Sequence, residues 1–403
     1  MLMKWLVSIV AVGVAWSADS DYGPLLERAR AKVIDEVQRI PRYVCRQKIE
    51  RLVSAVDPRP GAGCSELLAM HTKEPQRFRF ASLDRARLDV MLQGADELFS
   101  WPGEHKFESN DPSALLSEGI SGSGDFAGFL TDIFDGSRAT IKYGDKCDGA
   151  GCVRFQYDVA RGVSRYVLKT NAGSYVSGYR GIFDIDSRSA DLLQLTVRPT
   201  YLRDPQVCET ETTVRYGRAK SSAGEFMIPD TTERIALSLS GEYYDNKTSY
   251  EGCKQYKTES VLKFDEDASV PNPEVKPREP AAQPPKGAIL KLRFISTIDS
   301  EVSAAGDAVE AALAQPVRDE SGRVVTPANT VVRGHLTELQ RSYIPSILVK
   351  IHFSAIVLAG SDVPLKLKPS PQKNLGPGDT FIFRGKRVSL GKNFVSTWIV
   401  ETP

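Results

Sequence analysis

The residues from Tyr175 to Val197 alternate between apolar and polar side chains with a period of two. Such alternation is typical of β-strands that have one buried face and one wet face. The short polar residues from Asp186 to Ser189 interrupt the pattern, and side chains of this kind favour a tight turn. We therefore predict a two-stranded hairpin at the centre of a curved antiparallel sheet, with Gly178 and Gly181 permitting the curvature.

Two stretches have helical periodicity instead. Apolar residues recur every three or four positions between Asp21 and Pro41, which predicts an amphipathic helix that ends at the proline. Similar spacing behind Ser123, a residue able to cap a helix, predicts a short helix over residues 123–134. Other short runs up to Phe264 indicate strands, with a turn at residues 83–85. The predicted fold class is mainly β: a curved antiparallel half-barrel sheet with N-terminal and inserted helices.

Composition places boundaries along the chain. Residues 1–18 carry one lysine, an apolar run and small residues near Ala18, which indicates a signal peptide; an uncleaved anchor is the alternative. No later run is long enough to span a bilayer, so the mature chain is expected to lack a transmembrane span. Residues 268–286 contain six prolines and predict an extended spacer. We expect a half-barrel domain at 19–267 and a small C-terminal β-barrel or sandwich at 287–403, moving independently.

Charge and cysteine content narrow the partners. The chain has 52 Lys and Arg against 51 Asp and Glu, so no nucleic-acid partner is implied. Six cysteines in an exported chain indicate disulfides rather than metal. The histidines are isolated and CxxC spacing is absent, so no metal and no cofactor are expected. Local patterns favour three pairs: Cys45 with Cys64, Cys147 with Cys152, and Cys208 with Cys253.

Three short motifs could carry chemistry, and each has a plainer explanation. The loose GxGxxA of residues 122–128 follows no strand of a βαβ unit, so a cap and turn are favoured over a dinucleotide site. Ser121 and Ser123 lie among glycines, but GxSxG and a neighbouring histidine are missing, which argues against a serine hydrolase. Asp184 and Asp186 could hold a cation or act as a carboxylate pair, although acids beside a turn are usually only solvated.

The candidate ligand-binding residues are large apolar side chains of the predicted sheet and inserted helix. They line an apolar hollow if sheet curvature holds the two apart, and they form an ordinary core if it does not. These residues are Phe99, Trp101, Phe126, Phe129, Leu130, Ile133, Tyr179 and Phe183.

The order of these elements and the hairpin YxGIFDID…DLLQL resemble the lipoprotein-carrier (LolA-like) half-barrel superfamily over about residues 21–265, and a group of exported bacterial proteins with the same layout. The resemblance implies a curved sheet covered by helices around a hollow that shelters acyl chains. Residues 289–336, with turns at Gly306-Asp307 and Pro327-Ala328-Asn329, are similar to the β-domain of conjugation-channel TrbI-like proteins. That resemblance implies an assembly module without catalysis.

Together these features favour a noncatalytic exported envelope protein, periplasmic or extracellular, that binds an acyl chain or an apolar partner segment in the half-barrel. The expected partners are a lipid, a lipoprotein or another envelope protein. A secreted enzyme, such as a hydrolase with a dispersed active site, is the second function class. A purely structural or assembly protein is the third. No catalytic residue is assigned, because the sequence has no recognisable nucleophile, metal set or phosphate loop.

Overall fold

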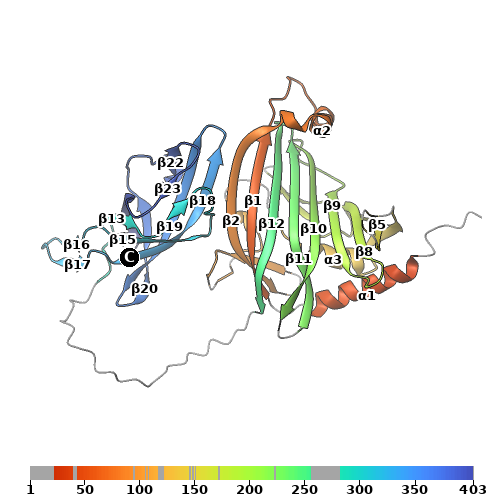
Figure 1. The fold of residues 1–403 in the computed structure, drawn as a ribbon, viewed down its shortest axis with the longest axis horizontal. Coiled ribbons are helices and arrows are strands. Elements are labelled where there is room, and N and C mark those ends of the chain that lie inside the picture. The colour runs from red at the N-terminus through yellow and green to blue at the C-terminus, as the bar shows by residue number, and fades with distance from the viewer. Residues whose placement is uncertain are drawn as a thin grey trace, which may run out of the picture.

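The structure of the chain, a computed structural model, has an N-terminal region between residues 22 and 255 and a C-terminal region between residues 282 and 402 (Figure 1). The predicted signal peptide, the strand expected to end at Phe264 and most of the predicted spacer lie outside the described residues. The described residues are 22–39, 43–93, 96–104, 106–107, 109–116, 122–144, 147, 149, 151–170, 173–221, 224–255 and 282–402.

The N-terminal region contains three α-helices among its described residues, and its other regular elements are strands and short 3-10 turns. The helices are α1 (Gly23–Arg39), α2 (Cys64–Lys73) and α3 (Gly128–Phe134). The first strands are β1 (Tyr43–Ala55), β2 (Arg79–Gln93), β3 (Asp96–Ser100), β4 (Ala139–Tyr143), β5 (Cys152–Val159), β6 (Val167–Thr170) and β7 (Gly173–Val176). The later strands are β8 (Tyr179–Asp186), β9 (Leu192–Pro199), β10 (Val207–Ser221), β11 (Gly224–Ser238) and β12 (Glu242–Gln255).

Most of these strands form one curved antiparallel sheet, as the alternation predicts. Neighbours follow the order β4-β5-β8-β9-β10-β11-β12-β1-β2-β3, and each pair is antiparallel. The predicted central hairpin is β8 and β9, with Phe183 opposite Leu195, but its first strand begins at Tyr179. Tyr175 lies in β7, which pairs with β6 in a separate two-stranded sheet. A Cβ atom added at Gly181 would lie 1.7 Å from the carbonyl oxygen of Thr196, so the close approach of β9 requires glycine there. The fold class predicted for this part of the chain is confirmed.

One face of the sheet, here called the inner face, is covered by α1 and α3 (Figure 1). The helix predicted between Asp21 and Pro41 is α1, which buries Leu25, Ala29 and Val33 at four-residue intervals. These side chains join a core with α3 and the apolar side chains of β5, β8 and β9. A second core lies beside it, under β1, β2 and β3.

Local elements differ from the prediction in three places. The helix expected over residues 123–134 begins only at Gly128, and its N-cap, Ala127, makes no side-chain cap bond. The turn expected at residues 83–85 is wrong, because β2 continues through these residues and pairs with β1 along its length. The sequence prediction also missed α2, which buries Leu67 and Met70 at three-residue spacing.

Two of the three predicted disulfide pairs are wrong. The structure joins Cys45 to Cys253 and Cys64 to Cys208, and it confirms only the local Cys147–Cys152 pair. The first bond forms because β12 is the sheet neighbour of β1, which brings two cysteines 208 residues apart to a Cα separation of 4.0 Å. The second attaches the first residue of α2 to β10. Pairing by closeness in sequence failed because the first and last long strands meet in space.

The C-terminal region contains only strands and a short 3-10 turn among its described residues. An apolar core lies between them and includes Trp398, Phe353 and Phe294. The first strands are β13 (Ile289–Phe294), β14 (Ile298–Asp299), β15 (Ala308–Leu313), β16 (Val317–Arg318), β17 (Val324–Thr326) and β18 (Val331–Ser342). The others are β19 (Ser346–Leu358), β20 (Ser361–Pro364), β21 (Lys366–Pro369), β22 (Phe381–Arg384), β23 (Ser389–Leu390) and β24 (Val395–Thr402).

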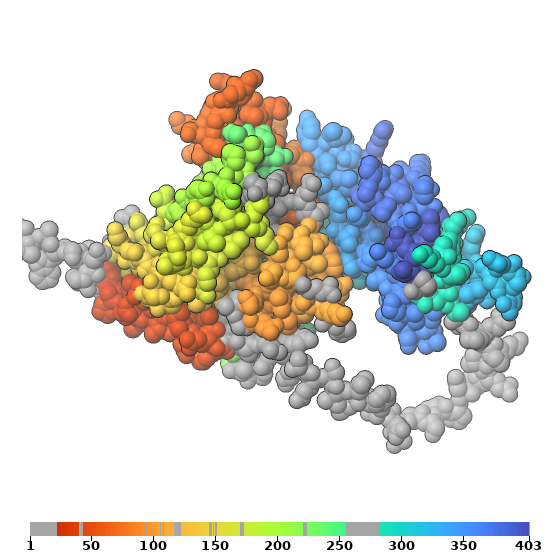
Figure 2. Space-filling model, turned by 180° about the vertical axis from the view of Figure 1, so that it is seen from behind, coloured from red at the N-terminus to blue at the C-terminus, as the bar shows by residue number. Residues whose placement is uncertain are grey.

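The two regions share a sheet at the edge of β2. Residues 82–84 of β2 pair with residues 340–342 of β18, and Arg87 forms an ion pair with Asp307. The backbone at Ala305 exchanges hydrogen bonds with Arg85 and Arg87, and Figure 2 shows the blue C-terminal atoms directly against the orange N-terminal ones. At Gly306, with φ of +91°, an added Cβ would lie 2.2 Å from the Arg87 carbonyl oxygen, so this contact needs glycine.

This junction does not fit the independent movement expected of the two regions. The proline content of the spacer predicts only the conformation of the spacer itself. Whether the two regions bind each other depends instead on the free edge of β2. An unpaired strand edge offers a row of N–H and C=O groups, and here β18 satisfies part of that row.

Candidate functional site

The candidate site lies on the inner face of the sheet, beneath residues 122–134. We call these residues the cover. The structure buries all eight predicted ligand-binding side chains but divides them between two cores. Phe129, Leu130, Ile133, Tyr179 and Phe183 share the core beneath α1 and α3. Phe99, Trp101 and Phe126 belong to the core beneath β1, β2 and β3.

The aromatic side chains of the cover rest on aromatic side chains of the sheet. The Phe129 ring lies 5.6 Å from that of Tyr179, and the Phe126 ring lies 5.1 Å from that of Tyr250, both edge to face. Such contacts add about 0.5–1.5 kcal/mol beyond simple burial. The cover therefore packs onto the inner face in the closed arrangement seen here.

Between these apolar contacts, Asp125 fastens the cover to three neighbouring strands. Its carboxylate accepts hydrogen bonds from the hydroxyls of Thr232 at 2.9 Å and Tyr250 at 2.6 Å, and it pairs with Arg234. Its backbone carbonyl accepts a further bond from the hydroxyl of Tyr216 at 3.1 Å. We call Asp125 and its partners Thr232, Arg234 and Tyr250 the polar anchor. All four side chains are buried, so each bond forms away from bulk water.

A second carboxyl group, Glu97 of β3, lies next to the anchor. Its Oε1 accepts a hydrogen bond from the backbone N–H of Phe126 at 3.0 Å. Burial, together with the nearby charge of Asp125, raises the pKa of Glu97 to about 7. One arginine therefore faces two buried carboxyl groups, and near neutral pH the second of them carries its charge only part of the time.

Asp132 holds the other end of the cover. This buried carboxylate accepts bonds from the side chain of Arg165 at 2.7 Å and from its backbone N–H at 3.2 Å. The Tyr179 hydroxyl also lies 3.4 Å from Asp132, and burial together with that carboxylate raises the pKa of Tyr179. Both ends of the cover are thus held by charged groups, while its middle is apolar.

One small cavity lies within the closed inner face. A cavity of about 20 Å³ lies beside the anchor, which is room for about one water molecule. Its walls include Gly122 and Arg234 from the cover and anchor, with Gln47, Asn246 and Thr248 from the sheet. The apolar hollow that the sequence predicts is therefore filled by side chains in this arrangement.

A larger groove of about 480 Å³ lies on the opposite face of the sheet. Charged side chains of neighbouring strands line it, and most of its cations are already paired. Lys48 pairs with Glu251, Arg85 with Glu50, and Lys247 with Glu233. Such cross-strand ladders are the usual solvated face of a sheet.

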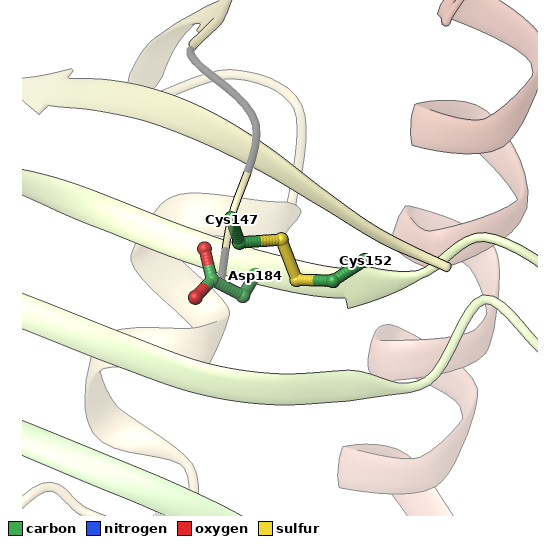
Figure 3. A group of neighbouring side chains, drawn as sticks. All are labelled: Cys147, Cys152 and Asp184. Atoms are coloured by element: carbon green, nitrogen blue, oxygen red, sulfur yellow. A yellow bond between two sulfur atoms is a disulfide. The ribbon is translucent and has the colours of Figure 1, made fainter. Parts of the chain in front are cut away.

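The acids of the central hairpin are occupied by structural bonds. Asp184 receives two hydrogen bonds from Arg154, at 2.7 and 2.8 Å. Asp186 accepts backbone N–H bonds from Arg188 and Ser189 in the turn, which lower the pKa of Asp186. The carboxylate of Asp184 also lies close to Cys147 and Cys152, but their sulfur atoms are bonded to each other and offer no thiolate for a metal (Figure 3).

The sequence reasoning missed the anchor, although a signal for it exists. Thr232 and Arg234 occupy alternate positions of β11, the positions that face inward. A long charged side chain at an inward position must meet a partner, because a buried charge is costly when unpaired. The partner, Asp125, lies in the glycine-rich stretch that the sequence assigned to a cap and turn.

No protein-family model matches the chain, and no curated protein matches its sequence. Among solved structures, the chain is similar to a LolA superfamily protein from Nitrosomonas europaea, with 11% identity and a TM-score of 0.25 over 57% of this chain and 94% of that one. A TM-score of 0.25 is too low to establish a common arrangement of strands. Among the described helices, none is long and apolar enough to cross a bilayer.

Proposed function

We propose that the chain is a noncatalytic exported protein whose cover opens from the inner face to admit an acyl chain or an apolar partner segment. The observation that carries the proposal is the polar anchor, a buried ion pair between Asp125 and Arg234 that joins the cover to the sheet. The three disulfides and the predicted signal peptide favour a periplasmic or extracellular location.

The anchor suits a segment that has to leave and return. A buried ion pair gives little net stability, because the loss of hydration offsets most of the attraction between the charges. When the cover opens, Asp125 and Arg234 recover their hydration. The free energy needed to separate them is therefore smaller than their attraction in the low-dielectric interior alone would require. Opening would expose Phe129, Leu130 and Ile133 on the cover, and a bound apolar chain would replace their lost contacts.

A titration of the full chain with a fluorescent fatty acid tests this proposal. We expect saturable binding by the native protein, faster binding by Arg234→Met because its cover is released, and loss of binding by Phe129→Asp. Arg46→Met is the matched control, because Arg46 pairs with Asp89 on the opposite face of the sheet and should leave binding unchanged. No binding by the native chain or by Arg234→Met at tens of micromolar ligand, with both folded by circular dichroism, would exclude the proposal.

The proposed boundaries remain a half-barrel domain at residues 19–267, a spacer at 268–286 and a C-terminal β-domain at 287–403. The assembly role of the C-terminal domain rests on its resemblance to the TrbI-like β-domain and stays a prediction. Non-denaturing mass spectrometry of the protein purified from its own host would reveal a co-purified acyl ligand or a partner protein directly.

A further inference from the structure

An exposed apolar tip lies where strands of the two regions meet. The hairpin between β18 and β19 carries Tyr343 and Ile344, with 69% and 75% of their surface exposed. The backbone N–H of Tyr343 bonds to the carbonyl of Ala81, so the tip lies beside the start of β2 (Figure 1). Phe80, the preceding residue of β2, is 40% exposed. Two segments about 260 residues apart in sequence thus present apolar side chains at one end of the molecule.

Basic side chains surround this tip. Arg79 precedes Phe80, and Arg341 lies two residues before Tyr343 in β18. Arg384 of β22 pairs with Ser346 across from the tip, and Lys386 follows after Gly385, whose N–H bonds to the Pro345 carbonyl. We call Arg79, Arg341, Arg384 and Lys386 the basic rim.

The cations of the basic rim are not neutralised by described acids. Within the described part of the chain, none of its four cations makes an ion pair, whereas Arg77 and Arg387 close by are paired with acids. The acids of the same strands lie further along β2 and β18; they are Asp84, Asp89 and Glu338. Asp84 is held by Arg51, and Asp89 pairs with Arg46. Charge that is left unpaired around exposed apolar side chains calls for an anionic partner.

We propose that this end of the protein binds the surface of an anionic lipid membrane, with Tyr343 and Ile344 inserted among the headgroups and the basic rim against the lipid phosphates. A projecting hairpin can enter the headgroup layer, and an amphipathic tyrosine ring suits that depth. Cations near such a surface each strengthen binding, by about fivefold per residue. An acidic protein segment matches the charges but not the two side chains projecting from the tip.

Sedimentation of the full chain with vesicles tests the proposal. We expect binding to vesicles of phosphatidylcholine and phosphatidylglycerol and much weaker binding to phosphatidylcholine alone. The double variants Tyr343→Ser/Ile344→Ser and Arg341→Gln/Arg384→Gln should each lose about tenfold or more in affinity. Added salt should weaken binding of the native protein, because the rim acts through screened charges.

Matched controls remove equal numbers of apolar or basic side chains elsewhere. Ile289→Ser/Val395→Ser changes two exposed apolar residues of β13 and β24, and Lys291→Gln/Lys392→Gln removes two exposed cations. Both controls should bind like the native chain. Equal binding to neutral and anionic vesicles, no binding to either, or equal losses in the controls would overturn the proposal. So would retention on immobilised polyglutamate without vesicle binding, which would assign the rim to an acidic protein.

Discussion

The N-terminal and C-terminal regions build β cores of different chemistry. The C-terminal core consists of aliphatic and aromatic side chains, and the buried polar side chains described there are Ser300, Thr326, Thr380 and Ser396, none of them charged. The N-terminal region buries ten charged side chains among its described residues: Glu36, Arg51, Asp84, Asp89, Glu97, Asp125, Asp132, Asp184, Asp204 and Arg234. All three disulfides also lie in the N-terminal region.

This difference shows that a β core in this protein does not need buried charge. Apolar packing alone closes the C-terminal core, and it usually gives more stability than a buried ion pair of similar volume. Several of the N-terminal charges instead fix segments that lie on the sheet. Asp125 and Asp132 hold the cover, and Glu36 of α1 accepts a bond from the backbone N–H of Met227 at 2.8 Å. The charges therefore specify where covering segments sit.

Breaking the anchor should give the largest effect. Arg234→Met leaves the Asp125 carboxylate buried without its cation, which should cost the N-terminal region about 3–5 kcal/mol. The triple variant Glu97→Gln/Asp125→Asn/Arg234→Met should cost less, because it leaves no unpaired charge. Urea unfolding combined with hydrogen exchange of each region measures both. A triple variant as unstable as the single one would show that the charges themselves stabilise the sheet.

Reduction of the disulfides should give the next largest difference in stability between the two regions. Each bond should contribute about 2–4 kcal/mol, because it restricts the unfolded chain, and only the N-terminal region has them. The N-terminal thermal transition should therefore fall on reduction while the C-terminal transition stays in place. Peptide mapping without reduction checks the pairing itself, and a Cys45–Cys64 peptide would contradict the structure.

A change of pH should then alter the stability of the N-terminal region through Glu97. Its pKa is raised by burial from an ordinary value of 4.5 to about 7, so the folded state binds the proton more tightly than the unfolded state. The stabilisation of the folded state by protonated Glu97 is complete below pH 4.5. It is lost as pH rises through 7, which lowers the free energy of unfolding by about 1–3 kcal/mol. Glu97→Gln should flatten the decline in N-terminal stability between pH 5 and pH 8. The exposed substitution Glu66→Gln should leave it unchanged.

The stability of the junction should depend on pH more weakly than that of the N-terminal region, and in the opposite direction. The His335 ring of β18 lies 4.9 Å from that of Trp101, and burial together with neighbouring His352 lowers the pKa of His335 to about 4. The folded state therefore disfavours the proton, and the stability of the junction should fall as pH drops from 6.5 through 4, by about 1–2 kcal/mol. Exchange of the β2 amides at residues 82–84 measures this. His335→Gln should abolish the dependence, and His71→Gln should not.

The sequence predicts the parts of this fold that depend on local pattern. Alternation places β8 and β9, and helical spacing places α1, because in both cases one face of a single element must be buried. It does not predict which distant strands become neighbours. The contact of β1 with β12 decides the Cys45–Cys253 disulfide, and no local pattern records that contact.

The candidate site is predictable to the same extent. The eight apolar residues are buried, which follows from their size and spacing, and their role in ligand binding stays a prediction. Whether such residues leave a hollow depends on fractions of an ångström in packing, which periodicity does not encode. Asp125 and Arg234 were missed because their partnership joins a loop to a strand more than 100 residues away.

The edge of β2 that pairs with β18 stays unpaired while the middle of the chain is being synthesised. Residues 82–84 emerge during synthesis long before residues 340–342, their partners in the junction. During that interval the N-terminal sheet has a free edge, and a free edge can pair with the edge of another molecule. Newly made chains are thus most prone to associate with one another before the C-terminal region is synthesised, and a chain truncated before Ile289 would keep that hazard permanently.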